Sequence, residues 1–470
     1  AAANKVAEVV VGQHGLLSTP AASHLIRLNQ ADGGFILSAS HNPAGIDKDF
    51  GVKFNTATGS PAPENLSDLV FQETLTLKAY MIADVDDIPL DIIDDYQLGP
   101  MSIRVVDPVA DYQKLMENLF DFDAIAHMFS QGFSICFDAM HAVTGPYAKA
   151  IFEDRLGAAS GSVMNATPLP DFGGGHPDPN PTWAASLMQL MASDQAPDLG
   201  AASDGDGDRN MVVSKNMYVA PSDSMAIIAA NAHLVPAYSE GLKGIARSMP
   251  TSAACDRVAA SLGIDLFETP TGWKFFGNLL DAGRVTICGE ESAGMGSNHI
   301  REKDGLWSVL MWLNILAKRH ASVEEVVTDH WGNFGRDYFC RMDFENVPSS
   351  DANDLVTRLQ SLLSELKGKK FDGLTVQKAD SFAYQDPVDG STSANQGIRI
   401  WFDNQMRAVV RLSGTGTQAA TIRVYLEKYE DRPSALQQDP KQVLKPLCAA
   451  VIALGNFEQI LGRTEPDVIS

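Results

Sequence analysis

The stretch Phe133-Ser134-Ile135-Cys136-Phe137-Asp138 is a short apolar run that predicts a buried strand, and a helical pattern from Gly145 to Leu156 follows it. The same alternation recurs further along, at Lys243 to Arg247 with Ala253 to Leu262 and at Arg284 to Cys288 with Gly305 to Lys318. Strands that alternate with helices in this way imply parallel or mixed sheets covered by helices.

The beginning of the chain shows the same alternation. Val9-Val10-Val11 and Gly34-Phe35-Ile36-Leu37 read as buried strands, and Thr19 to Leu28 between them reads as a helix. Ala1 to Ala7 has neither an initiator Met nor the regions of a signal peptide, and it reads as the end of a helix. We therefore expect the sequence to begin partway into a domain.

The pattern changes after Phe334. Closely spaced strands with short turns are predicted, together with two helices, at Ile398 to Asp403, Arg407 to Ser413, Thr421 to Glu427, Asp351 to Leu366 and Val443 to Leu461. Short turns between strands are typical of an antiparallel sheet, which predicts an α+β unit here.

A chain of 470 residues is too long for one hydrophobic core. We expect three α/β mixed-sheet domains followed by a C-terminal α+β domain. The expected boundaries are 1–108, 109–236, 237–330 and 331–470.

Composition limits the function classes. Lys and Arg total 36 against 59 Asp and Glu, a net charge of −23, so nothing favours binding to nucleic acid or to anionic lipid. The most apolar stretch, Val309 to Ala317, is too short to span a membrane. Five scattered cysteines without a CxxC pair argue against disulfides or a zinc site and for a reducing, cytoplasmic location. A large multidomain cytosolic enzyme is the expectation.

The strongest chemical signal is Asp204-Gly205-Asp206-Gly207-Asp208-Arg209. Carboxylates at i, i+2 and i+4 of an extended chain share one face, and the glycines let the loop fold around a hard cation. An EF-hand would need Gly at its sixth position and Glu at its twelfth, where Arg209 and Lys215 stand. The pattern instead suits Mg²⁺, with Arg209 binding a phosphate; a solvated acidic turn is the alternative.

A second signal, Ser38-Ala39-Ser40-His41-Asn42-Pro43, follows a predicted strand directly. A Ser at such an exit can present its hydroxyl to a cleft at the end of a sheet. The serine-hydrolase pattern G-x-S-x-G is absent here, and a segment of this kind taken alone is more often an ordinary turn.

Other loops have the composition of ligand sites. Arg411 to Thr417, with Arg423 on the next strand, combines Gly-rich backbone, hydroxyls and cations as in an anion nest, although a hairpin turn is the alternative. Glu290 and Ser292 can hydrogen-bond the hydroxyls of a sugar, or can be structural. Thr271-Gly272-Trp273-Lys274 places a Trp beside a cation, and such a Trp is more often part of the core.

Taken together, these loops resemble the α-D-phosphohexomutase family. Its members carry an active-serine loop (T-A-S-H-N-P), a metal loop (D-G-D-G-D-R), a sugar loop (G-E-x-S) and a phosphate loop (R-x-S-G-T), and here all of them occur in that order. Linking stretches such as Arg247-Ser248-Met249-Pro250-Thr251-Ser252 resemble the eukaryotic-type phosphoglucomutase branch, and within it a parafusin-type member. The resemblance covers essentially the whole chain.

The resemblance implies four domains around a deep central cleft, to which each domain contributes one loop. By position, Ser40 would carry a phosphoryl group, and Asp204, Asp206 and Asp208 with that phosphate would hold Mg²⁺. His41, Lys53 and Lys303 would line the reacting centre. Substrate would be bound by Arg209, Thr271, Gly272, Trp273, Lys274, Glu290, Ser292, Arg411, Ser413, Gly414, Thr415, Thr417 and Arg423.

The chain departs from the family pattern in a few places. Ser38 stands where Thr is usual and keeps the hydroxyl, and Ala293 stands where many eukaryotic relatives have Phe. The G-T-S-G-L-R segment with which the family opens, and the strand after it, do not appear in the sequence. We expect either upstream residues or a clipped, impaired form.

The resulting hypothesis is interconversion of glucose 1-phosphate and glucose 6-phosphate through glucose 1,6-bisphosphate, by a monomer or weak homodimer. The alternatives are a mutase for mannose or N-acetylglucosamine phosphates, a non-catalytic scaffold or regulatory phosphoprotein, and a Mg²⁺-dependent phosphatase. A dianionic substrate requires local cations within an acidic protein, because screening confines charge effects to about 8 Å at physiological salt. We therefore expect one positive patch made of Lys53, Arg209, Lys274, Lys303, Arg411 and Arg423.

Overall fold

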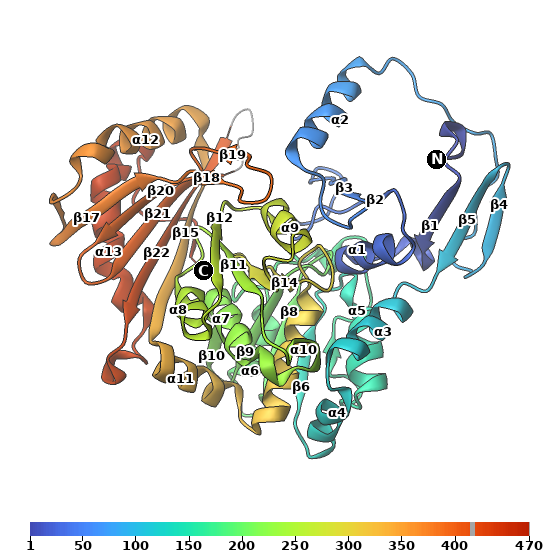
Figure 1. Ribbon diagram of the computed structural model, residues 1–470, viewed down its shortest axis with the longest axis horizontal. Coiled ribbons are helices and arrows are strands. Elements are labelled where there is room, and N and C mark those ends of the chain that lie inside the picture. The colour runs from blue at the N-terminus through green and yellow to red at the C-terminus, as the bar shows by residue number, and fades with distance from the viewer. Residues whose placement is uncertain (414–418, 470) are drawn as a thin grey trace.

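A computed structural model describes residues 1–413 and 419–469. Figure 1 shows the first part of the chain at one end of the molecule, the C-terminal part at the other, and the remaining sheets and helices between them. Along the chain, regions of mixed sheets and helices are followed by a region whose sheet is antiparallel. The predicted fold class, three α/β units and a C-terminal α+β unit, is confirmed.

The first region is built on a mixed sheet with the strand order β1-β5-β4. Its strands are β1 (Glu8–Gly12), β4 (Asp95–Leu98) and β5 (Met101–Val106). Helix α1 (Thr19–Leu28) begins where predicted, because the Ser18 hydroxyl accepts a hydrogen bond from the Ala21 amide and Pro20 stands in the first turn. A separate ribbon joins β2 (Gly33–Ile36) to β3 (Lys53–Thr56), and α2 (Glu64–Thr76) follows.

One prediction for this region is wrong. Gly34 to Leu37 does contain a strand, but that strand pairs antiparallel with β3 rather than joining the sheet of β1, and Phe35 and Leu37 are 74% and 70% exposed. Ile36, which points to the opposite side, is buried. An apolar run reports a preference for burial and cannot tell which strand will be its partner.

The second region has a sheet with the order β10-β9-β8-β6-β7. Its strands are β6 (Ile135–Asp138), β7 (Val163–Met164), β8 (Leu199–Ser203), β9 (Asn210–Ser214) and β10 (Met217–Val219). Its helices are α3 (Ala110–Leu119), α4 (Phe122–Ser130), α5 (Thr144–Ala148) and α6 (Ala185–Met191), and a π-helix (Lys149–Arg155) continues α5. The predicted βαβ unit is confirmed, because β6 and β7 pair in parallel on either side of α5.

The third region has a sheet with the order β12-β11-β13-β14. Its strands are β11 (Gly244–Ser248), β12 (Asp265–Thr269), β13 (Ile287–Gly289) and β14 (Met295–Ser297). Its helices are α7 (Pro221–Asn231), α8 (Ala254–Leu262), α9 (Trp273–Asp281), α10 (Gly305–Arg319) and α11 (Val323–Phe334). Strand β11 lies parallel to both β12 and β13, so this βαβ prediction is also confirmed.

Helix α10 joins the second and third regions. Every residue from Gly305 to Ala317 is buried, and the helix packs against α4, α7, β9 and β14. Its Leu and Trp side chains belong to one apolar core that runs through both regions. A helix that is apolar on all sides is the expected product of such a position.

The C-terminal region has a sheet with the order β16-β17-β20-β21-β22-β15-β23. Its strands are β15 (Arg336–Pro348), β16 (Lys370–Phe371), β17 (Leu374–Ser381), β20 (Ile398–Phe402), β21 (Met406–Ser413), β22 (Ala419–Glu430) and β23 (Val468–Ile469), and β18 (Tyr384–Gln385) pairs with β19 (Thr392–Ser393) beside it. Helices α12 (Ser349–Leu362), α13 (Pro440–Gly455) and α14 (Phe457–Leu461) cover the sheet and share with it a core of its own. The antiparallel sheet and its helices are confirmed.

All five cysteines have free thiols. Within residues 1–413 and 419–469, none of the helices is long and apolar enough to cross a membrane.

Candidate active site

The loop Asp204–Arg209 connects β8 to β9 and is held by its first carboxylate. Asp204 Oδ1 accepts hydrogen bonds from the amides of Gly207, Asp208 and Arg209 at 3.0, 2.9 and 3.0 Å. A carboxylate that binds successive amides folds the backbone around itself and fixes where the next side chains point.

The carboxylates of this loop form a site that fits a divalent cation. Asp204, Asp206 and Asp208 are 0%, 3% and 1% exposed, and each offers one ligand atom within 4.8 Å of the others. Asp206 Oδ1 and Asp208 Oδ1 are buried without a hydrogen-bond partner in the part of the chain that the structure describes. Buried carboxylate oxygens of this kind are costly unless they bind a cation, and a hard cation such as Mg²⁺ prefers oxygen ligands.

Basic side chains from distant segments surround the acidic loop. Lys53, at the start of β3, places its Nζ 2.5 Å from Asp206 and 3.4 Å from Asp208. Lys303, directly before α10, lies 3.3 Å from Asp208, and Arg209 lies 3.8 Å from Asp208 and 3.9 Å from Asp204. Negative and positive groups therefore lie in contact at one site, as phosphate binding beside a metal requires.

These neighbours shift the pKa values of the carboxyl groups in opposite directions. Burial, reinforced by Asp208 and Asp206, raises the pKa of Asp204 well above its usual range. Burial would also raise the pKa of Asp208, but Lys303, Lys53 and Arg209 outweigh it and hold that pKa below its usual range. The surrounding cations thus keep Asp208 ionised.

The Ser40 hydroxyl faces the acidic loop. Its Oγ lies 3.3 Å from Asp204 Oδ2, and its amide donates to the Ser38 hydroxyl at 2.9 Å. Ser40 has φ 59°, a left-handed conformation that costs free energy for a residue with a side chain. A Cβ added to Gly205 would lie 2.2 Å from the Ser40 carbonyl oxygen, so the two loops touch through a glycine.

His41 and Lys53 differ as proton acceptors. Burial, with Arg209 and Lys303 nearby, lowers the pKa of His41 to about 2, and its Nδ1 lies 3.5 Å from the Ser40 hydroxyl. Burial also acts to lower the pKa of Lys53, but Asp208, Asp206 and Glu302 raise it above its usual value. The imidazole is neutral near pH 7, whereas the ammonium group is charged.

A cavity of about 640 Å³ lies beside these groups and is lined partly by Lys53, Asp208, Glu302 and Lys303. Trp273 also borders it, although the indole packs against Phe276 in the core and donates from Nε1 to the Arg301 carbonyl at 3.0 Å. A cavity with both apolar walls and a charged end is the usual setting of a small-molecule site.

The predicted sugar loop lies between β13 and β14. Glu290 is buried, its Oε1 accepts from the Gly272 amide at 2.9 Å, and burial raises its pKa. The predicted loops of Thr271–Lys274 and Glu290–Ser292 are thus joined directly. Gly294 forms a bridge with Arg209, which brings the sugar loop next to the metal loop as well.

The structure gathers part of the predicted positive patch. Lys53, Arg209 and Lys303 meet at the acidic loop, whereas Lys274 binds Glu64 at 2.9 Å. Arg411 and Arg423 are opposite each other on β21 and β22 and contact groups of the C-terminal region. Ser413 ends β21, and Gly414, Thr415 and Thr417 lie outside the described residues.

Two further contacts at the site escaped prediction from the sequence. The buried Thr19 hydroxyl donates to Asp206 Oδ2 at 2.6 Å, and Asn55 Nδ2 donates to Glu302 Oε1 at 2.8 Å beside Lys53. Burial raises the pKa of Glu302 to about 7. A helix start such as Ser18-Thr19-Pro20 was the available signal for Thr19, but nothing in that pattern indicates its partner.

Comparison with protein families matches almost the whole chain. Residues 1–81, 110–217 and 221–334 match alpha/beta/alpha domains I, II and III of the phosphoglucomutase/phosphomannomutase family. Residues 336–467 match the family described as Phosphoglucomutase-1, C-terminal domain. The chain therefore belongs to the phosphoglucomutase/phosphomannomutase family, in agreement with the resemblance seen in its motifs.

Individual relatives within this family are described as phosphoglucomutases. The chain is 55% identical to a phosphoglucomutase of Rhizobium radiobacter, over 100% of this chain and 87% of the relative. It is 48% identical to a cytoplasmic phosphoglucomutase of Populus tremula, over 100% of this chain and 87% of the relative. The solved open form of pp63/parafusin from Paramecium, described as an exocytosis-sensitive phosphoprotein and phosphoglucomutase, superposes with a TM-score of 0.91 at 48% identity, covering 99% of this chain and 86% of that one.

Proposed function

We propose that this protein is an enzyme that interconverts glucose 1-phosphate and glucose 6-phosphate. The observation that carries the proposal is the Ser40 hydroxyl 3.3 Å from Asp204, at a buried carboxylate site ringed by cations. A hydroxyl that carries a phosphoryl group needs such neighbours, because phosphoryl transfer depends on positioning and charge stabilisation. Phosphoglucomutases similar over the full chain support the glucose substrate.

In the proposed reaction, phosphorylated Ser40 gives its phosphoryl group to the free hydroxyl of a sugar monophosphate. The bond from phosphorus to Ser40 Oγ breaks as a bond to the sugar oxygen forms, and the proton of that hydroxyl passes to a base. Ser40 Oγ takes up a proton as it leaves, and glucose 1,6-bisphosphate results and reorients. In the return step the Ser40 hydroxyl gives up its proton as Oγ bonds to the other phosphorus, and the sugar oxygen released there takes up a proton. Mg²⁺ held by Asp204, Asp206, Asp208 and the phosphate would neutralise charge that develops on the phosphoryl oxygens.

Of the two nearby candidates for the base, His41 is the one with a free lone pair near pH 7, although its low pKa makes it a weak base. Its ring is neutral at physiological pH and lies next to Ser40, whereas the carboxylates hold Lys53 in its charged form. Lys53 and Lys303 then act as fixed cations beside the phosphate, together with Arg209.

The remaining predicted residues would bind two parts of the substrate, the sugar ring and the phosphate that does not react. Glu290 and Ser292 would bind sugar hydroxyls, with Thr271, Gly272, Trp273 and Lys274 placing the ring. Arg411, Ser413, Gly414, Thr415, Thr417 and Arg423 would bind the phosphate that does not react. We propose that the C-terminal region swings to close on the substrate, because its phosphate loop belongs to a sheet with a separate core.

Several further points belong to the same proposal. The protein would use Mg²⁺ and glucose 1,6-bisphosphate, bind sugar phosphates, and act as a monomer or weak homodimer. A cytoplasmic location follows the cytoplasmic relative and the free thiols. The domain boundaries predicted from the sequence are retained as part of this proposal.

Another function deserves a direct test, because the similar pp63/parafusin is described as an exocytosis-sensitive phosphoprotein. A non-catalytic scaffold would keep the fold and would not depend on Ser40 for its effect.

The deciding experiment measures glucose 6-phosphate formed from glucose 1-phosphate by the purified protein with Mg²⁺ and a trace of the bisphosphate. Mannose 1-phosphate and N-acetylglucosamine 1-phosphate serve as competing substrates, and released inorganic phosphate is measured in parallel. Isomerisation that is fastest with glucose 1-phosphate supports the proposal. Faster turnover of another sugar, phosphate release without isomerisation, or a folded protein without turnover would each overturn it.

A further inference from the structure

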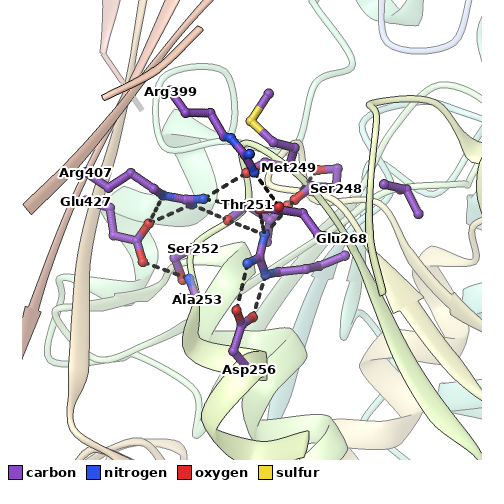
Figure 2. A network of polar contacts seen from close by, with 12 residues as sticks. Ser248, Met249, Thr251, Ser252, Ala253, Asp256, Glu268, Arg399, Arg407 and Glu427 are labelled. Carbon is purple, nitrogen blue, oxygen red and sulfur yellow. Dashed lines mark hydrogen bonds and ion pairs between the residues drawn. The ribbon is translucent and has the colours of Figure 1, made fainter. Parts of the chain in front are cut away.

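A network of buried and partly buried charges joins the third region to the C-terminal region, and Figure 2 shows it from close by. Glu268 of β12 binds Arg247 of its own sheet at 3.0 Å, and it also binds Arg399 and Arg407 of the C-terminal sheet at 2.5 and 3.5 Å. Arg247 in turn binds Asp256 of α8 at 2.6 Å. A carboxylate shared among several arginines makes the geometry of such a cluster specific.

Arg407 differs from the other arginines because it also binds the backbone of the neighbouring region. Its guanidinium donates to the carbonyls of Met249 and Thr251 at 3.2 and 2.7 Å (Figure 2). Glu427, opposite Arg407 on β22, binds this guanidinium at 2.6 Å and accepts from the Ala253 amide at 2.8 Å. Arg407 and Glu427 thus bind the backbone of the turn 248–253 from the C-terminal sheet, and both side chains are buried.

Side chains of the same turn also contact the sugar loop. The Ser248 hydroxyl donates to Glu291 Oε2 at 2.8 Å, and Thr251 Oγ1 lies 3.5 Å from the same oxygen. Glu291 is buried and directly follows Glu290. A displacement of the turn therefore moves or releases a carboxylate adjacent to the predicted sugar-binding residue.

Strands β21 and β22 connect these contacts to the residues that are predicted to bind phosphate. Arg407 lies opposite Glu427, and four residues further toward the phosphate loop Arg411 lies opposite Arg423. Four residues of strand span about 13 Å, and hydrogen-bonded strands behave as one unit. The contacts of Arg407 and Glu427 with the turn therefore set the orientation of this strand pair, and with it the position of the phosphate-binding residues relative to the sugar loop.

We propose that Arg407 is a positioning residue, which through the turn 248–253 sets the sugar loop relative to the phosphate-binding strands and so contributes to sugar phosphate affinity. The effect on sugar phosphate affinity rests on the proposed function. The link itself, from Arg407 through the turn 248–253 to the sugar loop, does not. The link is a feature of contacts that exist in the protein without substrate.

Arg407→Met and Arg399→Met are matched variants for the test. Both remove an arginine that binds Glu268 at the same interface, but Arg399 makes its other ion pair with Asp380 and does not bond the turn among the described residues. We expect Arg407→Met to raise the KM for glucose 1-phosphate about 10-fold or more while kcat changes less than about 3-fold. Arg399→Met should change both by less than about 3-fold. Arg407→Lys, which keeps the charge but loses the planar fork of the guanidinium group, should fall between.

Hydrogen exchange of the protein without substrate tests the link even if no turnover is found. Arg407→Met should speed amide exchange in residues 248–253 and 289–294, whereas Arg399→Met should not. Ser248→Ala, which removes the shorter hydrogen bond to Glu291 and also the Ser248–Thr251 hydrogen bond within the turn, should speed exchange in 289–294 as well. Unchanged exchange in 289–294 for both Arg407→Met and Ser248→Ala overturns the link. Equal KM changes in the two arginine variants, or a fall in kcat alone, overturn the affinity role, and an inactive wild type refutes the proposed function instead.

Discussion

The metal loop and the active-serine loop meet at one point but are stabilised differently. Asp204, Asp206 and Asp208 are almost fully buried, and backbone amides or cations bind each of them. The loop around Ser40 is half-buried, and exposed apolar side chains such as Leu37 and Ile46 flank it. The electrostatic part of the site is thus preorganised, whereas the hydroxyl that would react stays accessible.

This contrast predicts that metal binding and turnover can be separated at Ser40. Ser40→Ala should lower turnover by about 10⁴-fold or more, because the group that carries the phosphoryl is lost. Affinity for Mg²⁺ should change little in the unphosphorylated protein, since the buried carboxylates remain. A coupled mutase assay and calorimetric titration with Mg²⁺ measure the two effects, and retained turnover would contradict the assignment.

A substitution in the metal loop should instead lower both turnover and Mg²⁺ affinity. Asp208→Asn removes the carboxylate that Lys53, Lys303 and Arg209 surround, so turnover should fall about 10²–10³-fold. Mg²⁺ affinity should fall by more than about 10-fold, because loss of a residue that only hydrogen-bonds a metal ligand already lowers affinity by about that much. The same assay and titration apply; Mg²⁺ affinity equal to that of the wild type would show that this carboxylate is not a ligand.

Gly205 tests the contact between the two loops. Gly205→Ala places a Cβ 2.2 Å from the Ser40 carbonyl oxygen, which forces the serine away from the carboxylates. A displacement near 1 Å costs about 100-fold in turnover, while Mg²⁺ affinity should stay near that of the wild type. Gly332→Ala, on α11 at a position with open space and an ordinary helical backbone, controls for the added methyl group. Wild-type turnover in Gly205→Ala would mean that the loops move independently.

The smallest expected effect concerns His41 and the pH dependence of stability. Its folded-state pKa of about 2 lies below the usual 6.5, so the unfolded chain binds more protons as pH falls below 6.5. The free energy of unfolding should therefore decrease on acidification, and His41→Gln should remove about 1 kcal/mol of that decrease between pH 7 and pH 5, since the ring is partly exposed. Urea denaturation of both proteins at the two pH values measures it. An unchanged pH slope would show that folding does not lower the pKa of His41.

The sequence predicted the parts of the site that a short motif contains. Spacing indicated that the carboxylates of Asp204, Asp206 and Asp208 would lie together, and they do, although the loop turns around Asp204 and is not extended. It could not indicate that Thr19, far away in sequence, bonds Asp206, because a helix-capping pattern does not specify a tertiary partner. The antiparallel C-terminal sheet was predictable because its strands follow one another with short turns.

Pairing in the first region was less predictable for the same reason. Strand β2 has the composition of a buried strand, yet its partner β3 lies beyond the loop of Ser40. Likewise, Arg407 reads as an ordinary strand residue until the fold brings it to the turn after Met249. Contacts between regions depend on how the sheets are docked, and a local pattern carries no information about docking.

The burial of α10 has a consequence for how the molecule unfolds. Because its side chains complete one core with residues of both the second and the third region, neither of those regions can lose its structure without exposing the apolar surface of the other. The C-terminal sheet has a separate core, and it meets its neighbour through the charged network and a smaller apolar cluster that includes Met249 and Val409. Differential scanning calorimetry should accordingly resolve a transition for the C-terminal region apart from a larger one shared by the second and third.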